Sequence, residues 1–371
     1  MRVLITGSDG FIGKNLVSRL KQNRSIALDC FVKGDSLSKL QESVQASNLI
    51  VHLAAANRPD HEDEFKKTNI DLTKSIAELL TIEDCKCKRL IFSSTTKVEE
   101  NSSYGISKLK AENVLSKLAK HNPEIQISNL RFPGVFGKWS KPNYNSVVAT
   151  FSHNIINDLP INVHNPNEMI NLLYIDDALD FIEQELFQKH KKGFHNIKIK
   201  NTHEISVGDL AKLLQEFKGL RASKEMFNLC NYFQKALYST FISFYNEVDF
   251  FYKSEIHEDE RGIFSEFLKS PFFGQMSYFT VNPGMIRGGH YHHTKTEKFL
   301  VLSGKVDFTF KSIISDEVFT KSVSDKENLV IESIPGWQHS IENKTRSTAI
   351  CLVWANEMFD NEKPDTFVEK H

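Results

Sequence analysis

The chain has 371 residues, of which 40% are hydrophobic and 25% are charged, and its formal net charge is -1. This length exceeds that of an ordinary single domain, so we expect two domains. The near-neutral charge gives no electrostatic reason to bind nucleic acid or an anionic membrane, and neither is expected as a partner. The 5 cysteines form no CxxC pair, and neither a signal peptide nor an apolar run of ~20 residues is apparent. These features predict a cytoplasmic protein.

The first residues predict a turn that binds a dinucleotide. "RVLITG" is a short β-branched run typical of a strand, and "GSDGFIGKNLVSRL" continues it as a helix. In this spacing Gly7 permits a tight turn, Gly10 lets a pyrophosphate approach the backbone, and Gly13 allows the helix to pack closely. The helix N-terminus offers free N–H groups to phosphates. We therefore expect Gly7, Gly10, Phe11, Ile12 and Gly13 to line a coenzyme site.

Further apolar runs at 26–32, 49–55, 89–94 and 125–131 alternate with helical segments such as "EFKKTNIDLTKSIAELL". Alternation of strands and helices at this spacing predicts an α/β fold with a doubly wound parallel sheet of the Rossmann type.

The stretch "YGISK" places a phenol, Tyr104, and an ammonium, Lys108, one helical turn apart on the same face. A nearby ammonium lowers the pKa of a phenol from its usual value of about 10, so the phenol can exchange a proton with a carbonyl at neutral pH. Ser94 and Thr95, at the end of the preceding strand, can hold the carbonyl oxygen. A solvated Tyr–Lys pair on an amphipathic helix is the alternative, and the glycine turn favours the catalytic interpretation.

This part of the chain resembles the extended short-chain dehydrogenase/reductases. Besides the motifs above, the matching stretches are "HLAA", "FSST", "LRFPGVFG" and "NLLYIDDAL". The resemblance implies that Tyr104 is the acid/base, that Lys108 also holds the nicotinamide ribose, and that Thr95 or Ser94 orients the substrate oxygen. It also implies further contacts with coenzyme and substrate, at Leu53 and Ala54 for the coenzyme and at Arg131 for the substrate.

The residues after Thr95 narrow the reaction. Sugar dehydratases of the resembled family carry an Asp-Glu pair at this place, whereas this chain has Thr96 and Lys97. This departure argues against elimination of water and favours simple hydride transfer.

The coenzyme is predicted from the end of the second strand, "CFVKGD". NAD enzymes usually place there an acid that binds the ribose 2′-OH. Here Lys33 precedes Asp35, and a cation suits a 2′-phosphate. We expect NADPH rather than NADH, with a merely solvated Lys33 as the alternative.

Segments 207–220 and 225–246 have helical character, and the second is rich in Phe and Tyr at core-like spacing. After them the chain changes to short β-prone runs separated by turns. We place the domain boundary here, with a dinucleotide-binding domain at residues 1–245 and a second domain at residues 246–371.

The last third predicts a small antiparallel barrel that holds a metal. "FLVLSGKVDFTFKSI", "NLVIESI" and "TAICLVWANE" alternate with turns. His290 and His292 share a face because side chains along a strand repeat every two residues, while Glu297 and His339 belong to later strands. Imidazole and carboxylate groups suit Zn, Fe, Mn or Ni without choosing among them, and we take zinc as the working expectation. A purely structural histidine cluster is the alternative.

This part resembles the cupins. Gly284, the His290-x-His292 pair, Glu297 and Gly304 follow the first cupin motif throughout. The second motif is partial, because "PGWQH" is one residue shorter than its usual PxGxxH, which leaves the position of His339 less defined. The resemblance implies an all-β cupin (jelly-roll) domain.

A second resemblance, to the cupin-fold epimerases of nucleotide-linked 4-ketosugars, rests on "DERGIFSE" and "RGGH". Those enzymes use no metal, and their corresponding histidine is a base. His290 could therefore be a metal ligand or the base, and the richer ligand set favours the metal. The resemblance implies that Arg261 and Arg287 hold substrate.

The order of the two parts resembles the bifunctional UDP-2-acetamido-2,6-dideoxy-β-L-arabino-hexul-4-ose reductases, which act as homodimers. This implies that a UDP-linked 4-keto-6-deoxy amino sugar is epimerised at C3 in the cupin part. NADPH then reduces it at C4 to UDP-N-acetyl-6-deoxy-L-talosamine, a precursor of UDP-N-acetyl-L-fucosamine for capsule or O-antigen. The segment "KWSKPNYNS" lies where relatives bind substrate, so Asn143, Tyr144 and Asn145 are candidates.

Three other functions remain open on the sequence. The cupin part could be a binding or dimerisation module without catalysis. The chain could also be a nucleotide-sugar 4-epimerase that keeps NAD bound and returns the hydride. A nucleotide-sensing regulator of the same fold is the third, although a sensor has no need of the Tyr–Lys–Thr set.

Overall fold

The computed structural model describes residues 1–188 and 192–368. The chain forms two compact units. Unit 1 comprises Met1–Phe217 and Tyr232–Tyr245, and unit 2 comprises Lys218–Asn231 and Asn246–His371.

Unit 1 is built on a parallel sheet with the strand order β2-β1-β3-β4-β5-β8. Its strands are β1 (Arg2–Thr6), β2 (Ala27–Phe31), β3 (Leu49–His52), β4 (Arg89–Thr95), β5 (Gln126–Phe132) and β8 (Gly193–Ile197). The order reverses between β1 and β3, and in open α/β sheets ligands bind beyond the carboxyl ends of the strands at such a point.

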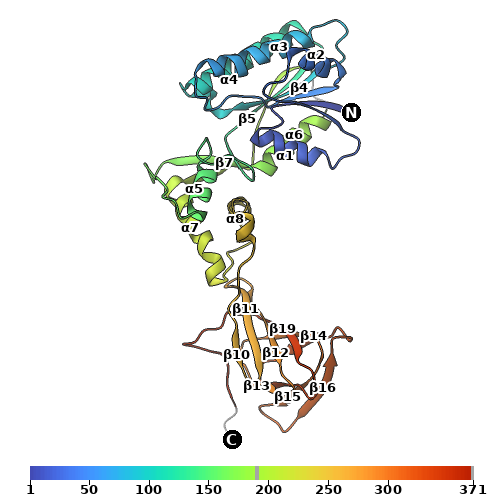
Figure 1. Ribbon diagram of the computed structural model, residues 1–371, viewed down its shortest axis with the longest axis vertical. Coiled ribbons are helices and arrows are strands. Elements are labelled where there is room, and N and C mark those ends of the chain that lie inside the picture. Colours follow the sequence, from blue (N-terminus) through green and yellow to red (C-terminus); the bar gives the residue numbers. More distant parts are fainter. Residues whose placement is uncertain (189–191, 369–371) are drawn as a thin grey trace. The chain divides into compact units, whose positions relative to one another are not determined.

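Helices cover both faces of this sheet (Figure 1), which confirms the predicted doubly wound fold. Leu4 belongs to the core under the helices of one face, while its neighbours Val3 and Ile5 belong to the core under the other. Strands buried on both faces explain the nearly continuous apolar runs in the sequence. The helices are α2 (Leu37–Ala46), α3 (Leu72–Leu80) and α4 (Ser103–His121) on one face and α1 (Phe11–Leu20) and α6 (Ile175–Phe187) on the other.

A second, smaller sheet and several helices complete unit 1. The sheet contains β6 (Gly134–Phe136), β7 (Met169–Tyr174) and β9 (His203–Ser206). The helices are η1 (Phe65–Asp71, a π-helix), η2 (Thr96–Glu99), α5 (Val147–Ile156), α7 (Val207–Ser223) and α8 (Tyr232–Ile242). The last residues of α7, 218–223, belong to unit 2.

The helix predicted at 225–246 is shorter than expected. Only Tyr232–Ile242 is helical, because the residues before it make other bonds: Met226 N donates to Lys269 O at 2.9 Å, and Asn228 Oδ1 accepts from Cys230 N at 3.0 Å. Within the helix, the aromatic residues pack as core, with the Phe241 ring edge-on to that of Phe217.

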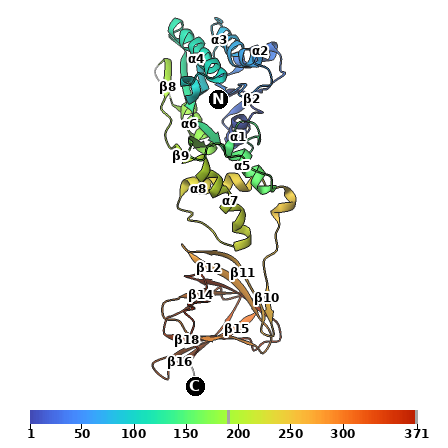
Figure 2. The same ribbon diagram turned by 90° about the vertical axis from the view of Figure 1, so that its left-hand side faces the viewer.

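Unit 2 contains two antiparallel sheets (Figure 2), as the sequence predicted for the C-terminal part. Phe279 and Phe299 from the larger sheet and Phe308 and Ile341 from the smaller one share a core. The larger sheet contains β10 (His257–Asp259), β11 (Gly262–Ser270), β12 (Gly274–Val281), β19 (Ala349–Ala355), β14 (Glu297–Ser303) and β17 (Val330–Ser333). The smaller contains β13 (Ile286–His290), β18 (Trp337–Glu342), β15 (Lys305–Ser312) and β16 (Val318–Ser324), and η3 (Glu247–Phe250) precedes both.

None of the helices within the described ranges has the length and apolar composition needed to span a bilayer.

The glycine turn after β1 is closely packed. Gly7 has a φ of +69°, and a Cβ there would lie 2.7 Å from the Ala54 Cα. A Cβ on Gly13 would lie 2.1 Å from Gly7 O and 2.7 Å from the Ser8 Cα. Gly13 therefore lets the first turn of α1 lie against the turn that precedes it.

We predict that Gly13→Ala destabilises unit 1 by about 1–3 kcal/mol, because the added methyl group meets backbone atoms that cannot move aside cheaply. Chemical unfolding followed by circular dichroism measures the change. Gly219→Ala is the control, since its Cβ would have no heavy atom within 4 Å. A Gly13→Ala protein that unfolds at the wild-type denaturant concentration would contradict the packing.

Candidate active site and metal centre

The glycine turn and the segment after β3 meet at the carboxyl edge of the sheet. Gly10 N donates to Gly7 O at 3.0 Å, which closes the turn in front of α1. Leu53 N donates to Thr6 O at 3.1 Å and Ala54 N to Thr6 Oγ1 at 3.3 Å. The structure thus brings the predicted coenzyme residues of both segments together, with Phe11 and Ile12 in the first turn of α1.

His52 links the elements that form this edge through hydrogen bonds. It is fully buried, and its two ring nitrogens lie 2.7 Å from Thr6 Oγ1 and 2.9 Å from Thr73 Oγ1. Burial and the nearby Lys108 ammonium lower the pKa of His52 to about 3. The ring is therefore neutral at physiological pH and joins β1, β3 and α3 as a hydrogen-bonding bridge.

Lys33 lies in the loop after β2, with its side chain 83% exposed and its Nζ 3.2 Å from Glu64 Oε2. Asp35 is bound within the same loop, where it accepts from Val32 N and from Lys39 Nζ, each at 2.8 Å. These hydrogen bonds, that of Lys39 foremost, hold the pKa of Asp35 below its usual value.

Helix α4 carries Tyr104, Lys108 and Glu112 at four-residue intervals, which we call the α4 stripe. Ser102 caps the helix by accepting from Gly105 N at 3.1 Å. Lys108 is 1% exposed, and its Nζ lies 4.1 Å above the centre of the Phe92 ring.

The electrostatics of the stripe differ from the sequence-based expectation that Lys108 lowers the pKa of Tyr104. Burial, reinforced by Tyr144, raises the pKa of Tyr104 to about 12. Burial also lowers the pKa of Lys108 to about 7, against the opposing effect of Glu112. The physical reason is desolvation, which disfavours the charged form of both groups.

The two predicted hydroxyls at the end of β4 have different partners. Thr95 Oγ1 accepts from Lys97 N at 3.2 Å, so its own hydrogen can still be donated to a substrate oxygen. Ser94 Oγ instead donates to Glu112 Oε1 at 2.5 Å. Thr95 is therefore the better placed of the two.

Glu112 was not among the predicted site residues. Besides Ser94, it binds Arg131 through two hydrogen bonds, Nε to Oε1 at 3.0 Å and Nη2 to Oε2 at 2.7 Å. Arg131, a predicted substrate residue, is thus held by the stripe. The sequence signal that could have revealed Glu112 is its position one turn after Lys108 on the same helical face.

The segment 138–146 contains Tyr144, which reinforces the upward shift of the Tyr104 pKa. Tyr144 Oη accepts from Arg58 N at 3.2 Å, and Tyr144 O accepts from Arg58 Nη1 at 3.0 Å. Asn143, with a φ of +55°, donates its N–H to Thr150 Oγ1 at 3.0 Å. Asn145 is exposed in the same segment.

Asn69 joins the coenzyme edge to α4. It lies on the π-helix η1, an element often found at functional sites. Its Oδ1 accepts from Ala56 N at 2.7 Å, and its Nδ2 donates to Ser107 Oγ at 2.8 Å.

In unit 2, backbone geometry brings His290 to His339. The two residues are register partners on β13 and β18, beside a bulge at Gly288 and Gly289, whose φ values are +79° and +80°. A Cβ on Gly288 would lie 2.8 Å from His339 O, so glycine is needed for the strands to approach.

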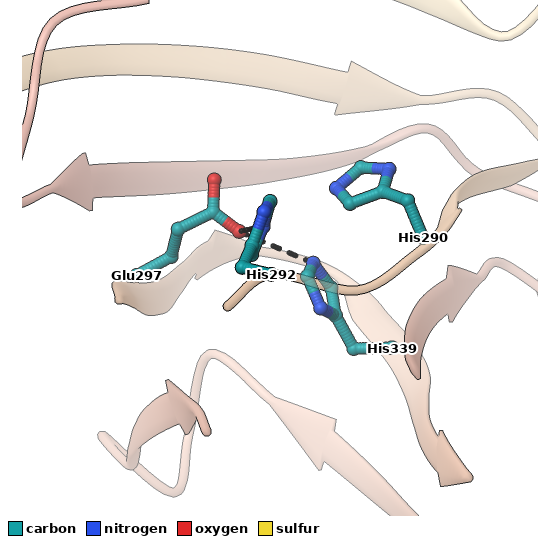
Figure 3. A group of neighbouring side chains, drawn as sticks. All are labelled: His290, His292, Glu297 and His339. Carbon is teal, nitrogen blue, oxygen red and sulfur yellow. Dashed lines mark hydrogen bonds and ion pairs between the residues drawn. The ribbon is translucent and has the colours of Figure 1, made fainter. Parts of the chain in front are cut away.

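Figure 3 shows His290, His292, Glu297 and His339 pointing toward one another. One ligand atom from each lies within 4.8 Å of the others. His339 thus joins the cluster despite the shortened motif that precedes it. His292 Nε2 and His339 Nε2 lie 3.1 Å and 3.2 Å from the same oxygen, Glu297 Oε2.

The hydrogen-bond partners of these rings indicate which kind of ion the cluster can bind. His292 Nδ1 contacts the backbone oxygen of Asp365, which can only accept, so a neutral His292 keeps its lone pair on Nε2. That lone pair then faces a carboxylate oxygen, an arrangement that needs either a proton or a cation between them. Burial and the neighbouring His339 lower the pKa of His290 to about 4. Three imidazoles and a carboxylate are a ligand set that suits Zn and other borderline divalent metals.

The two predicted arginines of unit 2 are both engaged. Arg261 Nη2 forms an ion pair with Asp259 Oδ2 at 2.5 Å. Arg287 Nε donates to Thr280 O at 2.7 Å and its Nη2 to Ile263 O at 3.3 Å. Asp259 lies between them, 3.7 Å from the Arg287 Nη2.

Two family models match separate parts of the chain, one in each unit. Residues 3–197 match the NAD dependent epimerase/dehydratase family, and residues 257–367 match the polysaccharide biosynthesis C-terminal domain. The chain is 39% identical over 367 residues to the UDP-2-acetamido-2,6-β-L-arabino-hexul-4-ose reductase of Pseudomonas aeruginosa, covering 99% of this chain and 98% of that one. It is 28% identical over 243 residues to the dTDP-4-dehydro-6-deoxyglucose reductase of Escherichia coli, covering 53% of this chain and 75% of the relative.

Among solved structures, the capsular polysaccharide assembling protein CapF of Staphylococcus aureus matches with a TM-score of 0.90 and 34% identity, covering 100% of both chains. The likeness extends over both units and confirms the family resemblance found in the motifs. The chain therefore belongs to the UDP-2-acetamido-2,6-β-L-arabino-hexul-4-ose reductase family.

Proposed function

We propose that unit 1 uses NADPH to reduce the C4 ketone of a UDP-linked 4-keto-6-deoxy-N-acetylhexosamine, giving UDP-N-acetyl-6-deoxy-L-talosamine. The observation that carries this proposal is the α4 stripe, which starts at Tyr104 and contacts the end of β4 through the hydrogen bond from Ser94 to Glu112. The name of the P. aeruginosa relative supports a 4-keto UDP-sugar as substrate.

The side chains of unit 1 bind, orient and supply a proton. When bound, the nicotinamide supplies the hydride. Tyr104 donates its phenolic proton to the carbonyl oxygen, and the Lys108 ammonium stabilises the negative charge left on the phenol. The Thr95 hydroxyl donates a second hydrogen bond to the same oxygen. Because Tyr104 has a pKa of about 12, its proton is present at neutral pH and available for donation.

We further propose that unit 2 inverts C3 of the same sugar before the reduction. A C4 ketone acidifies the C3 hydrogen, so a base can remove it when the charge that develops on the ketone oxygen is stabilised. A divalent metal, with zinc the working expectation, held by His290, His292, Glu297 and His339 would supply that stabilising charge. His290 is either the fourth ligand or the base, and return of a proton to the opposite face inverts the centre.

The setting of the reaction is also a proposal. The match to the polysaccharide biosynthesis C-terminal domain and the likeness to CapF, a capsular polysaccharide assembling protein, support a role in polysaccharide synthesis. We propose that the product leads to UDP-N-acetyl-L-fucosamine for a capsule or O-antigen. We propose that the protein acts there as a cytoplasmic homodimer.

Tyr104→Phe should lower the rate of ketone reduction at least about 100-fold, because the proton donor is lost while the ring is kept. The measurement is NADPH oxidation with the 4-keto UDP-sugar. Tyr252→Phe is the matched control, since this exposed tyrosine contacts Arg221 through its ring. Wild-type protein should consume NADPH and form product in equal amounts. Interconversion of the two C4 alcohols of a UDP-sugar without net NADPH consumption would instead indicate a 4-epimerase.

Incubation of the full-length protein with the 4-keto sugar in deuterated water, without NADPH, should place deuterium at C3, as read by NMR. Tyr104→Phe should exchange at the wild-type rate, whereas His339→Ala should fall to the rate without enzyme. His257→Ala, an exposed histidine of β10, is the control. Exchange by wild type no faster than without enzyme would leave unit 2 as a non-catalytic module.

Lys33→Ala should raise the KM for NADPH about 10-fold and leave the KM for NADH unchanged, since a charged hydrogen bond contributes about 1.5–3 kcal/mol. Steady-state kinetics with both coenzymes measure this. Lys86→Ala removes the same charge from an exposed position elsewhere in unit 1. Equal effects of Lys33→Ala on the two coenzymes would show that Lys33 does not read the 2′-phosphate.

A further inference from the structure

The loop at 291–296, which we call the ligand loop, joins β13 to β14 and carries His292. It is held by residues far along the chain. Asp365 Oδ1 accepts from His293 N at 2.9 Å, and Asp365 Oδ2 accepts from Thr294 N and Lys295 N, each at 2.7 Å. Thr294 Oγ1 donates to Oδ2 as well, at 2.9 Å. One carboxylate thus fixes three successive backbone amides of the ligand loop.

The backbone around Asp365 extends this contact. Phe367 pairs with Tyr291 in both directions, N to O at 3.0 Å and at 2.9 Å. The Phe367 ring stacks on Tyr291, with centroids 5.6 Å apart, and also contacts His293 at 4.8 Å. The segment 365–367 therefore adds a short antiparallel partner to the ligand loop.

Asp365 also contacts the side chain of His292, one of the four proposed metal ligands. The Asp365 carbonyl oxygen accepts from His292 Nδ1. This bond fixes the plane of a ring that is 1% exposed and leaves Nε2 as the nitrogen that faces Glu297. Groups that hold the second nitrogen of a ligand histidine orient the ring and tune its affinity for metal.

We propose that Asp365 is a positioning residue for the metal centre, and that the segment 365–367 acts as a clasp that holds His292 in its ligating orientation. This inference rests on the proposed metal-binding function of unit 2. The clasp acts at two points: the carboxylate shapes the ligand loop, and the carbonyl oxygen orients the imidazole.

The two points can be separated by mutation in the full-length protein. Asp365→Ala removes the carboxylate and keeps the carbonyl. Asp365→Asn keeps the shape and one acceptor oxygen. A chain that ends at residue 364 loses both. Asp360→Ala is the matched control, because Asp360 accepts from Glu362 N within the same terminal segment.

Zn²⁺ affinity, measured by competition with a chromophoric chelator, should fall about 10- to 100-fold in Asp365→Ala. The loss should be smaller in Asp365→Asn and larger in the shortened chain. The d–d absorption of the Co²⁺-loaded protein should change in the same order, and Asp360→Ala should match wild type in both measurements. Amide hydrogen exchange at 293–295 should be faster in metal-free Asp365→Ala than in metal-free wild type.

The outcomes separate the clasp from the metal site. Suppose that wild type binds Zn²⁺, and that Asp365→Ala and the shortened chain bind it equally well with an unchanged Co²⁺ spectrum. The proposed role of the clasp is then wrong, and the proposed metal site stands. If wild type itself binds neither ion, the metal site is wrong and the clasp falls with it. Should Asp365→Ala not fold, unchanged affinity and spectrum in Asp365→Asn and in the shortened chain would overturn the inference.

Discussion

The burial of one face of α4 against the ends of β4 and β5 is the interaction on which the catalytic chemistry of unit 1 depends. It places the Lys108 ammonium 1% exposed, 4.1 Å above the Phe92 ring, and one turn from Tyr104. A buried ammonium is costly, and the carboxylate of Glu112 one turn further on offsets part of that cost. Glu112 also binds Arg131, so the charges of the stripe are tied to the sheet edge where coenzyme and substrate are expected.

Unit 2 also buries a charged side chain, in this case an anion rather than a cation. The Glu297 carboxylate lies among three imidazoles, and two of their nitrogens approach a single oxygen. Burial lowers the pKa of His290, and the lone pair of a neutral imidazole can bind a cation. A ketone at C4 connects the two units chemically, since it both acidifies the neighbouring C3 hydrogen and accepts a hydride. Under the proposed function, this dual reactivity accounts for a dinucleotide fold and a histidine cluster in one chain.

The family, the fold class, the Tyr104–Lys108 pair and the His290–His292 pair could be predicted because their signals are local. The glycine spacing, "YGISK" and the His290-x-His292 pair each lie within a few residues. The pairing of Glu112 with Arg131 could not be predicted, because it depends on β5 lying beside α4. The contact of Asp365 with His292 joins residues 73 apart in the chain. The direction of the Tyr104 pKa shift was missed because spacing reveals a neighbouring charge but not the loss of water.

The central claim is that one ketosugar is inverted at C3 in unit 2 and then reduced at C4 in unit 1. It is tested most directly by running the complete reaction with NADPH in deuterated water and examining the reduced sugar by NMR and mass spectrometry. Inversion must draw the new C3 hydrogen from solvent, so every reduced molecule should carry deuterium at C3 and the inverted configuration there. A product reduced at C4 that retains protium and its original configuration at C3 would contradict the account.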